Sequence, residues 1–165
     1  QYGHTSDING LSSHLSREKC WVSVSEDRSC IMWDKNELRP ATLLLGDHPV
    51  GFSDVIWSAD NAIIMSDHEG NLITIDPRNP NVIVTKEQVS KRNITRLDAA
   101  NNKKTFGVIS DSTELKIYQF DGKLKCIHEM DAHPNLLYGM AWDGKDEKSC
   151  YVVGENKFAK KITID

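Results

Sequence analysis

The stretch Ser25-Glu26-Asp27-Arg28-Ser29-Cys30-Ile31-Met32-Trp33-Asp34 decides the fold, because its pattern returns three more times along the 165-residue chain. The later copies cover residues 67–76, 111–119 and 154–163. Their closing positions, 34, 76, 119 and 163, are separated by 42, 43 and 44 residues. A fixed period of this size is typical of a chain made of stacked copies of one small structural unit. The sequence therefore predicts four equivalent units.

A second landmark repeats in phase with the first. The positions ahead of the four copies are His4, His48, Ser90 and His133, at steps of 44, 42 and 43 residues. Behind each of them stands a pair of apolar residues three positions apart: Ile8 and Leu11, Phe52 and Val55, Ile94 and Leu97, Leu137 and Met140. Short β-rich segments follow at 20–24, 62–65, 104–109 and 150–153, separated by turn clusters such as 76–81 and 121–123. No helical period is sustained, so the sequence predicts an all-β chain.

These landmarks resemble those of the WD-repeat family over essentially the whole chain, and the first copy is the best preserved. The resemblance implies a β-propeller with four blades, at about residues 1–43, 44–86, 87–129 and 130–165. Because propellers of this family usually close with about seven blades, and an open stack leaves two apolar faces wet, we expect this chain to be roughly the C-terminal half of a longer ring. The outer strand of the last blade would then come from the N-terminal part of the protein.

In the WD-repeat family a His, a Ser or Thr, an Asp and a Trp form a hydrogen-bonded tetrad. The matching residues here are His4, Asp27 and Trp33, with Ser23 or Ser25 as the hydroxyl. Its role would be structural, since it pairs polar groups that would otherwise be buried without partners.

The other copies depart from the tetrad pattern. Ser90 replaces the His and Tyr118 the Trp in the third copy, while Ile75 and Ile162 replace the Trp in the second and fourth. We expect those copies to depend on apolar packing and to be less stable.

Acidic residues gather in the turns between the second and third strands of the repeats. They are Glu26, Asp67, Glu69, Asp111, Glu114 and Glu155, opposed by Arg28 and Lys157. In a propeller these turns share a face with the loops that carry the His, so they would form an acidic rim that attracts Arg- or Lys-rich peptides. The alternative is that they are ordinary turn residues, some of which serve a tetrad.

Composition excludes several classes of function. The four cysteines, Cys20, Cys30, Cys126 and Cys150, form no Cys-x-x-Cys pair, so we expect buried free thiols and no zinc or other cofactor. A net charge of −4 argues against a nucleic-acid surface. No apolar run approaches the roughly 18 residues of a membrane helix, and the first residues do not resemble a signal peptide. We expect a cytoplasmic protein, with the nucleus as an alternative compartment.

Motifs of catalysis are absent from the sequence. It contains no Gly-x-Ser-x-Gly, no phosphate-binding Gly-rich loop and no His-Glu-x-x-His. The pairs His68-Glu69 and His128-Glu129 could serve acid–base chemistry, but polar pairs at turns and strand ends are the simpler interpretation. Trp57 and Trp142 are expected to pack between repeats. The sequence therefore indicates a binding platform and not an enzyme; a hydrolytic propeller would need a catalytic or metal cluster that the sequence does not offer.

The order of intact and degraded copies resembles one branch of the WD-repeat family, the methylosome subunits that accompany the type II (symmetric) protein arginine methyltransferase. The similar segments are residues 22–34 with 39–41, residues 67–76 and residues 132–142. The resemblance implies a non-catalytic subunit of a hetero-oligomer that binds the methyltransferase and helps present Arg-rich substrates, such as histone tails and Sm proteins. A more general WD-repeat scaffold, such as a ubiquitin-ligase substrate adaptor or a histone-peptide reader, would show the same repeats.

Overall fold

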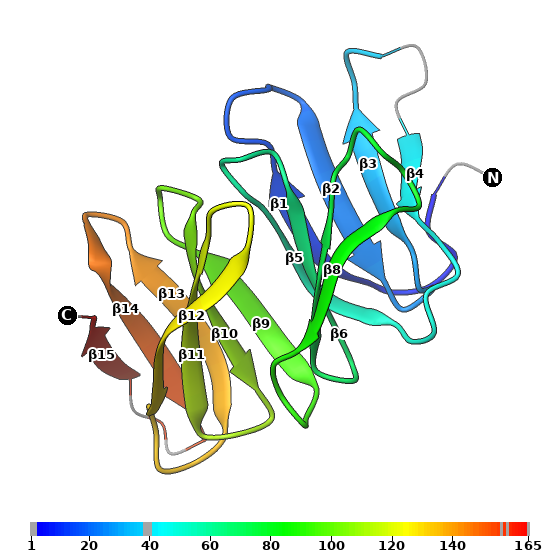
Figure 1. Ribbon diagram of the computed structural model, residues 1–165. Helices are drawn as coiled ribbons and strands as arrows, with labels where there is room; N and C mark the ends of the chain where they lie inside the picture. The colour runs from blue at the N-terminus through cyan, green and yellow to red at the C-terminus, as the bar shows by residue number, and fades with distance from the viewer. Residues whose placement is uncertain (1–2, 38–40, 156, 158, 165) are drawn as a thin grey trace.

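The structure is a computed structural model that describes residues 3–37, 41–155, 157 and 159–164. In these residues all regular secondary structure is β-strand, arranged in four antiparallel sheets that follow one another along the chain (Figure 1). The prediction of an all-β chain is confirmed. The four sheets resemble the blades of a propeller, and the described residues form no closed ring.

Within each sheet every strand pairs with the next strand in the sequence. The first sheet holds β1 (Ile8–Ser13), β2 (Cys20–Ser25), β3 (Cys30–Asp34) and β4 (Ala41–Leu45). The second holds β5 (Phe52–Trp57), β6 (Ile63–Asp67), β7 (Asn71–Ile75) and β8 (Ile83–Gln88). The third holds β9 (Ile94–Ala99), β10 (Thr105–Ser110), β11 (Glu114–Phe120) and β12 (Leu124–Asp131). The fourth holds three strands, β13 (Leu137–Asp143), β14 (Asp146–Gly154) and β15 (Ala159–Thr163).

The sheets stack through their first strands: β1 contacts β5, β5 contacts β9 and β9 contacts β13. Because successive side chains of a strand point to opposite faces, a middle sheet contributes to two cores. Ile63 and Met65 of β6 pack toward the first sheet, whereas Ile64 between them packs toward the third. A third core joins the third and fourth sheets and includes Ile117 and Met140. This double coverage explains why every residue of β6 and β7 is buried.

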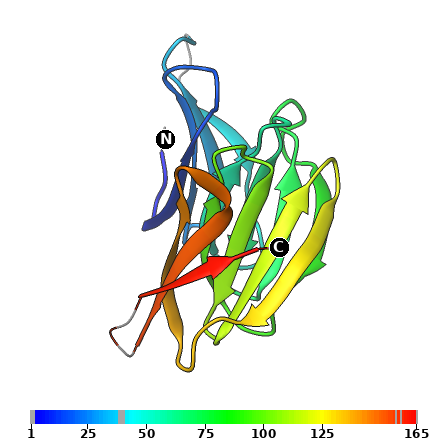
Figure 2. The same cartoon turned by 90° about the vertical axis from the view of Figure 1, so that its left-hand side faces the viewer.

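Two sheet faces are left without a covering sheet among the described residues. Leu11 and Leu43 stand on the face of the first sheet that points away from its core, and they are 65% and 49% exposed. Tyr151 and Val153 stand on the corresponding outer face of the fourth sheet, 42% and 43% exposed. Figure 2 shows the fourth sheet facing the viewer with nothing in front of it. The stack is therefore open at both ends of the described chain.

Candidate functional site

The turn between the second and third strands of each sheet lies against the loop that leads into the same sheet. Four equivalent backbone hydrogen bonds make this contact. The N–H groups of Glu26, His68, Asp111 and Glu155 donate to the carbonyls of Asp7, Gly51, Asn93 and Leu136, at 3.0, 3.3, 3.0 and 3.1 Å respectively. The donors are 42, 43 and 44 residues apart, so the period of the sequence is also the period of the structure. We call the surface formed by these turns and loops the rim, and these four donor residues the rim positions.

A hydrogen-bonded relay lies beneath the rim in the first sheet. The indole N–H of Trp33 donates to Ser23 Oγ at 2.8 Å, and Ser23 Oγ lies 2.7 Å from His4 Nε2. On its other side His4 Nδ1 lies 3.0 Å from Asp27 Oδ2. A neutral imidazole satisfies both contacts, because Nδ1–H donates to the carboxylate while Nε2 accepts from the Ser23 hydroxyl. Of the two serines considered from the sequence, the structure brings Ser23 into the relay.

Asp27 anchors the acidic end of this relay. Besides His4, it accepts hydrogen bonds from the Ser29 hydroxyl at 2.6 Å and from the Thr5 N–H at 2.7 Å. Burial by itself would raise the pKa of Asp27, but these hydrogen bonds and the neighbouring His4 outweigh it and hold the pKa below its usual value. Asp27 therefore stays ionised and keeps the His4 ring in one orientation. The role of the relay is structural, since each polar group is used to satisfy another.

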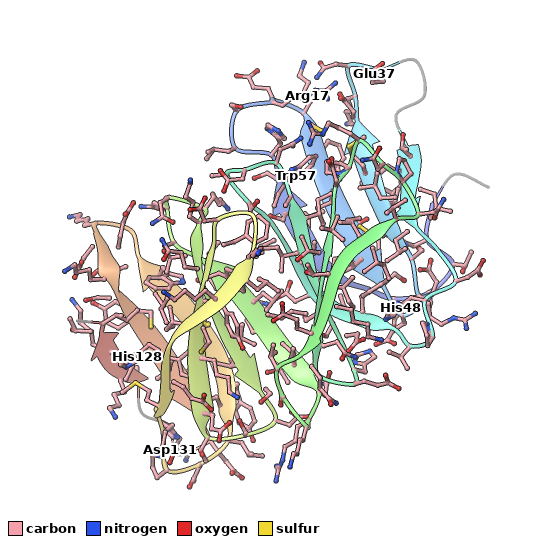
Figure 3. The ribbon with its side chains drawn as sticks, viewed as in Figure 1. Arg17, Glu37, His48, Trp57, His128 and Asp131 are labelled. Carbon is pink, nitrogen blue, oxygen red and sulfur yellow. The ribbon has the colours of Figure 1, made fainter. Side chains whose placement is uncertain are left out.

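Ser25, the other serine weighed for the relay, has a different partner. Its hydroxyl accepts a hydrogen bond from the N–H of Asp27 at 3.0 Å and so shapes the turn after β2. The Asp34 of the Trp-Asp pair is also buried, where it forms an ion pair with Arg17 and accepts from the N–H of Asn36 at 2.9 Å. Arg17 bridges further to Glu37 at 3.1 Å, at the end of the sheet opposite the rim (Figure 3).

The second sheet contains a shorter polar cluster built on a different acid. His48 Nε2 lies 3.1 Å from Asp67 Oδ2, and the ring of His48 stacks on Phe52 at 4.8 Å between centroids. Figure 3 labels His48 at the rim end of this sheet and Trp57 at the opposite end. Asp67 also accepts from the side chain of Asn71 and from the N–H groups of Glu69 and Asn71. Ile75 stands where Trp33 stands in the first sheet, so the cluster ends in the apolar core.

The third and fourth sheets have less of this polar cluster than the first two. In the fourth sheet His133 is 5% exposed, and its Nδ1 accepts from the N–H of Asn135 at 3.1 Å. Gly154 holds the position that Asp67 holds in the second sheet, and a Cβ there would lie 2.6 Å from His133 Nδ1. No acidic partner can therefore replace this glycine without moving the ring. In the third sheet Tyr118 stacks on Phe106 at 5.7 Å within an apolar core.

The structure separates the acidic residues that the sequence groups together. Glu26, Glu69, Asp111, Glu114 and Glu155 are exposed on the rim. Asp67 is completely buried and fully engaged with His48 and Asn71, so it contributes nothing to an acidic surface. Glu114 lies 3.9 Å from Lys116 Nζ, which partly offsets its charge. In the pairs His68-Glu69 and His128-Glu129 one member of each is engaged elsewhere: His68 contacts Glu26, and Glu129 pairs with Lys116 at 3.0 Å.

Two carboxylates that the sequence did not single out, one buried and one partly buried, connect neighbouring sheets. Asp54 Oδ2 accepts from the N–H of Leu97 in the next sheet at 2.9 Å, and burial raises the pKa of Asp54 to about 6. Asp98 repeats this contact one sheet on, because its Oδ2 accepts from the N–H of Trp142 at 3.0 Å and its carbonyl accepts from the Trp142 indole at 2.8 Å. Both contacts span one repeat of sequence, 43 and 44 residues. Nothing in the sequence around either aspartate indicates these contacts.

The cysteines and the candidate cofactor sites also have clear positions. Cys20, Cys30 and Cys150 are buried, whereas Cys126 is exposed, which corrects the expectation that all four thiols are buried. Cys126 lies on an outer strand with no further strand paired to its free edge in the described residues.

Within the described ranges no three His, Cys, Asp or Glu side chains are placed to hold a metal ion. A hollow of about 460 Å³ beside the relay is lined by Asp27, Ser29 and Leu43 and opens onto the uncovered face of the first sheet.

Comparison with known proteins adds no relative to this description. A scan against protein-family models found no match, and a search of curated proteins found no similar sequence. In the part of the chain that the structure describes, no helix is long and apolar enough to cross a membrane.

Proposed function

We propose that this chain is part of a WD-repeat propeller that acts as a non-catalytic interaction scaffold. The observation that carries the proposal is the Trp33–Ser23–His4–Asp27 relay, whose connectivity agrees with the tetrad that the family resemblance implies. The relay lies under the rim and holds a turn and a leading loop together. Such a site fixes the shape of a surface without offering a nucleophile or a general base to a substrate. Further sheets of the same kind would cover Leu11 and Tyr151 and close the ring.

For the partner, we propose a type II protein arginine methyltransferase, with Arg-rich chains such as histone tails and Sm proteins as the substrates presented. This finer proposal rests on the sequence resemblance to methylosome protein 50, called Valois in flies. The exposed acids of the rim support it, because an acidic surface accelerates the capture of Arg-rich peptides. The methyl donor and the chemistry would belong to the enzyme subunit, and the complex would work in the cytoplasm or the nucleus.

Affinity purification of the full-length protein, followed by assay for symmetric dimethylation of an Arg-rich histone-tail peptide, tests the partner. Recovery of that activity supports the proposal. Recovery of ubiquitin-ligase subunits without methyltransferase activity would replace it with the adaptor function, and the scaffold proposal would stand.

A charge-reversal series tests the rim itself. Changing Glu69, Asp111, Glu114 and Glu155 to Lys should weaken binding of an Arg-rich peptide at least several-fold at low salt, with less effect at high salt. The matched control is Asp121→Lys, an exposed acid in the turn between β11 and β12 at the opposite end of the sheets. Equal binding by the rim variant and the control would refute an acidic docking surface.

A further inference from the structure

The four rim positions are occupied by three acids and one histidine. They are Glu26, His68, Asp111 and Glu155, each bonded in the same way to its own leading loop. Carboxylates at neighbouring rim positions would repel one another, whereas a protonated His68 would attract Glu26. His68, in the second sheet, is therefore the one rim position of the four that is not an acid.

His68 makes contacts that cross both sheet boundaries. Its Nε2 lies 2.7 Å from Glu26 Oε1 in the first sheet, and its Nδ1 lies 2.9 Å from Asn93 Oδ1 in the loop that leads into the third. Asn9 of β1 extends the network, because its Nδ2 donates to Glu26 Oε1 at 2.8 Å and to the carbonyl of Phe52 at 2.8 Å. One imidazole thus links three sheets at the surface.

The backbone beneath this network is shaped to admit it. Gly51 lies directly under the Glu26–His68 contact, and a Cβ on Gly51 would overlap Glu26 Oε2 and lie 3.1 Å from His68 Nε2 and Cδ2. The carbonyl of Gly51 also accepts the backbone N–H of His68. A glycine at this position lets the two side chains meet across the boundary between the sheets.

The protonation state of His68 decides how many of its contacts are hydrogen bonds. Both ring nitrogens face oxygen acceptors, so the imidazolium can donate to Glu26 and Asn93 together. A neutral ring keeps one N–H, and Asn93 must then turn its amide to donate in return. We propose that His68 is a pH-sensitive clasp, which fastens the first three sheets along the rim when its ring is protonated and loosens them when the proton is lost.

The charged groups around His68 favour its protonated form. Glu26 faces it from the first sheet, and the buried Asp67 lies beside it in its own sheet. In the third-sheet loop, Arg92 donates to the carbonyl of Asp111 at 2.7 Å. Burial by itself would lower the pKa of His68, but the contacts with Asn93 and Glu26 and the charges of Glu26 and Asp67 outweigh it and raise the pKa.

Glu26 responds in the opposite sense. The hydrogen bond from Asn9 is the main cause that lowers the pKa of Glu26; burial opposes it, and His68 lowers the pKa further. A raised pKa on His68 gives stability that is complete below about 6.5 and is lost as pH rises through the folded value. A lowered pKa on Glu26 gives stability that is present above about 4.3 and is lost as pH falls through the folded value. The clasp is therefore strongest between roughly pH 4.5 and 6.5.

Proton NMR titration of the histidines in the full chain, with assignment through the variant His68→Gln, tests the clasp. We expect His68 to titrate above about 6.5, and Glu26→Gln to lower its pKa by roughly half a unit or more. The control is Glu155→Gln, which removes the acid at an equivalent rim position far from His68 and should leave that pKa unchanged. A His68 pKa at or below the ordinary value, or no response to Glu26→Gln, would overturn the proposal.

The mechanical consequence needs a separate measurement. Hydrogen exchange at the N–H groups of His68 and Asp111, corrected for the intrinsic rate at each pH, should show protection that falls as pH rises from 5.5 to about 8 in the native protein. In His68→Gln the corrected protection should not change with pH. The same pH dependence in both proteins would mean that His68 does not fasten the sheets.

Discussion

The first and fourth sheets are built on the same strand pattern but satisfy their buried polar groups differently. In the first, four side chains from β2, β3 and two loops form a continuous relay from Trp33 to Asp27. In the fourth, His133 keeps its buried place and its Nδ1 contacts the backbone of Asn135, while Gly154 stands where the first sheet has Ser25 and the second has Asp67. The comparison shows that the histidine holds the same place in both sheets while its described hydrogen-bond partners differ. We therefore expect the loss of unfolding free energy on replacing this histidine to differ from sheet to sheet.

The largest expected effect is in the second sheet, where the histidine is paired with a buried acid. His48→Ala leaves Asp67 without its side-chain partner from the leading loop and empties the space above Phe52, so we expect a loss of about 3 kcal/mol in the free energy of unfolding. His133→Ala, the matched change in the fourth sheet, removes no acidic partner and should cost less. Urea unfolding of both variants checks this difference, and equal losses would contradict it.

Within the first sheet, Ser23 is the junction of the relay. Ser23→Ala removes the acceptor of the Trp33 indole and the partner of His4 together, with an expected loss of about 2 kcal/mol. Ser6→Ala, a serine exposed on the leading loop, is the control and should change stability by less than about 0.5 kcal/mol. If thermal unfolding shows the two variants to be alike, the relay does not stabilise the sheet.

The contact between the second and third sheets should depend on pH through Asp54. Burial raises the pKa of Asp54 to about 6. Between about pH 4 and 6 the Asp54 carboxyl is therefore protonated in the folded state and ionised in the unfolded state. The contribution of Asp54 to stability therefore increases as pH falls from 7 to 5, by about 1 kcal/mol. Asp54→Asn should lack this increase when chemical unfolding is measured at both pH values. If the substitution leaves the pH dependence of stability unchanged, a group other than Asp54 takes up the proton.

The smallest effect is expected on the rim. Glu69→Gln should change stability by less than about 0.5 kcal/mol, because its side chain is exposed. Asp67→Asn, two residues away, alters a buried carboxylate that accepts four hydrogen bonds from Glu69 and Asn71, and should be clearly destabilising. Differential scanning calorimetry of the two variants separates a surface acid from a structural one.

The repeat in the sequence predicts the four sheets because period and strand pattern are local properties. The predicted segments 20–24 and 104–109 nearly coincide with β2 and β10, while β14 begins four residues before the predicted 150–153. The acids were harder to place, since Asp67 and Glu69 have the same local surroundings in the sequence. Their burial depends on whether a histidine from a distant loop reaches them, and only the folded chain shows that His48 reaches Asp67.

The inter-sheet carboxylates could not be found for the same reason. Asp54 and Asp98 stand on strands that carry other polar residues as well, Ser53 in β5 and Thr95 and Arg96 in β9, and nothing in their neighbourhood indicates an N–H one repeat later. Likewise, the sequence could not decide between Ser23 and Ser25. The two serines are two positions apart on β2 and face the same side of the sheet, so only the tertiary contacts show which of them meets His4. The exposure of Cys126 follows from its place on β12, the outermost strand of its sheet, which is paired with another strand along one edge only in the described residues.

The contacts through Asp54 and Asp98 join each sheet only to the next one, and this affects how the chain comes apart. A row of units coupled to nearest neighbours behaves as a one-dimensional array, so opening proceeds from an end and need not involve every unit at once. The first two junctions have side-chain hydrogen bonds at the rim through Asn9, Glu26, His68 and Asn93. The last has there the backbone bond from the Leu137 N–H to the Ser112 carbonyl, and otherwise depends on Asp98, Asn101, Asn102 and apolar packing. In an open stack, unfolding would begin with the fourth sheet and advance toward the first.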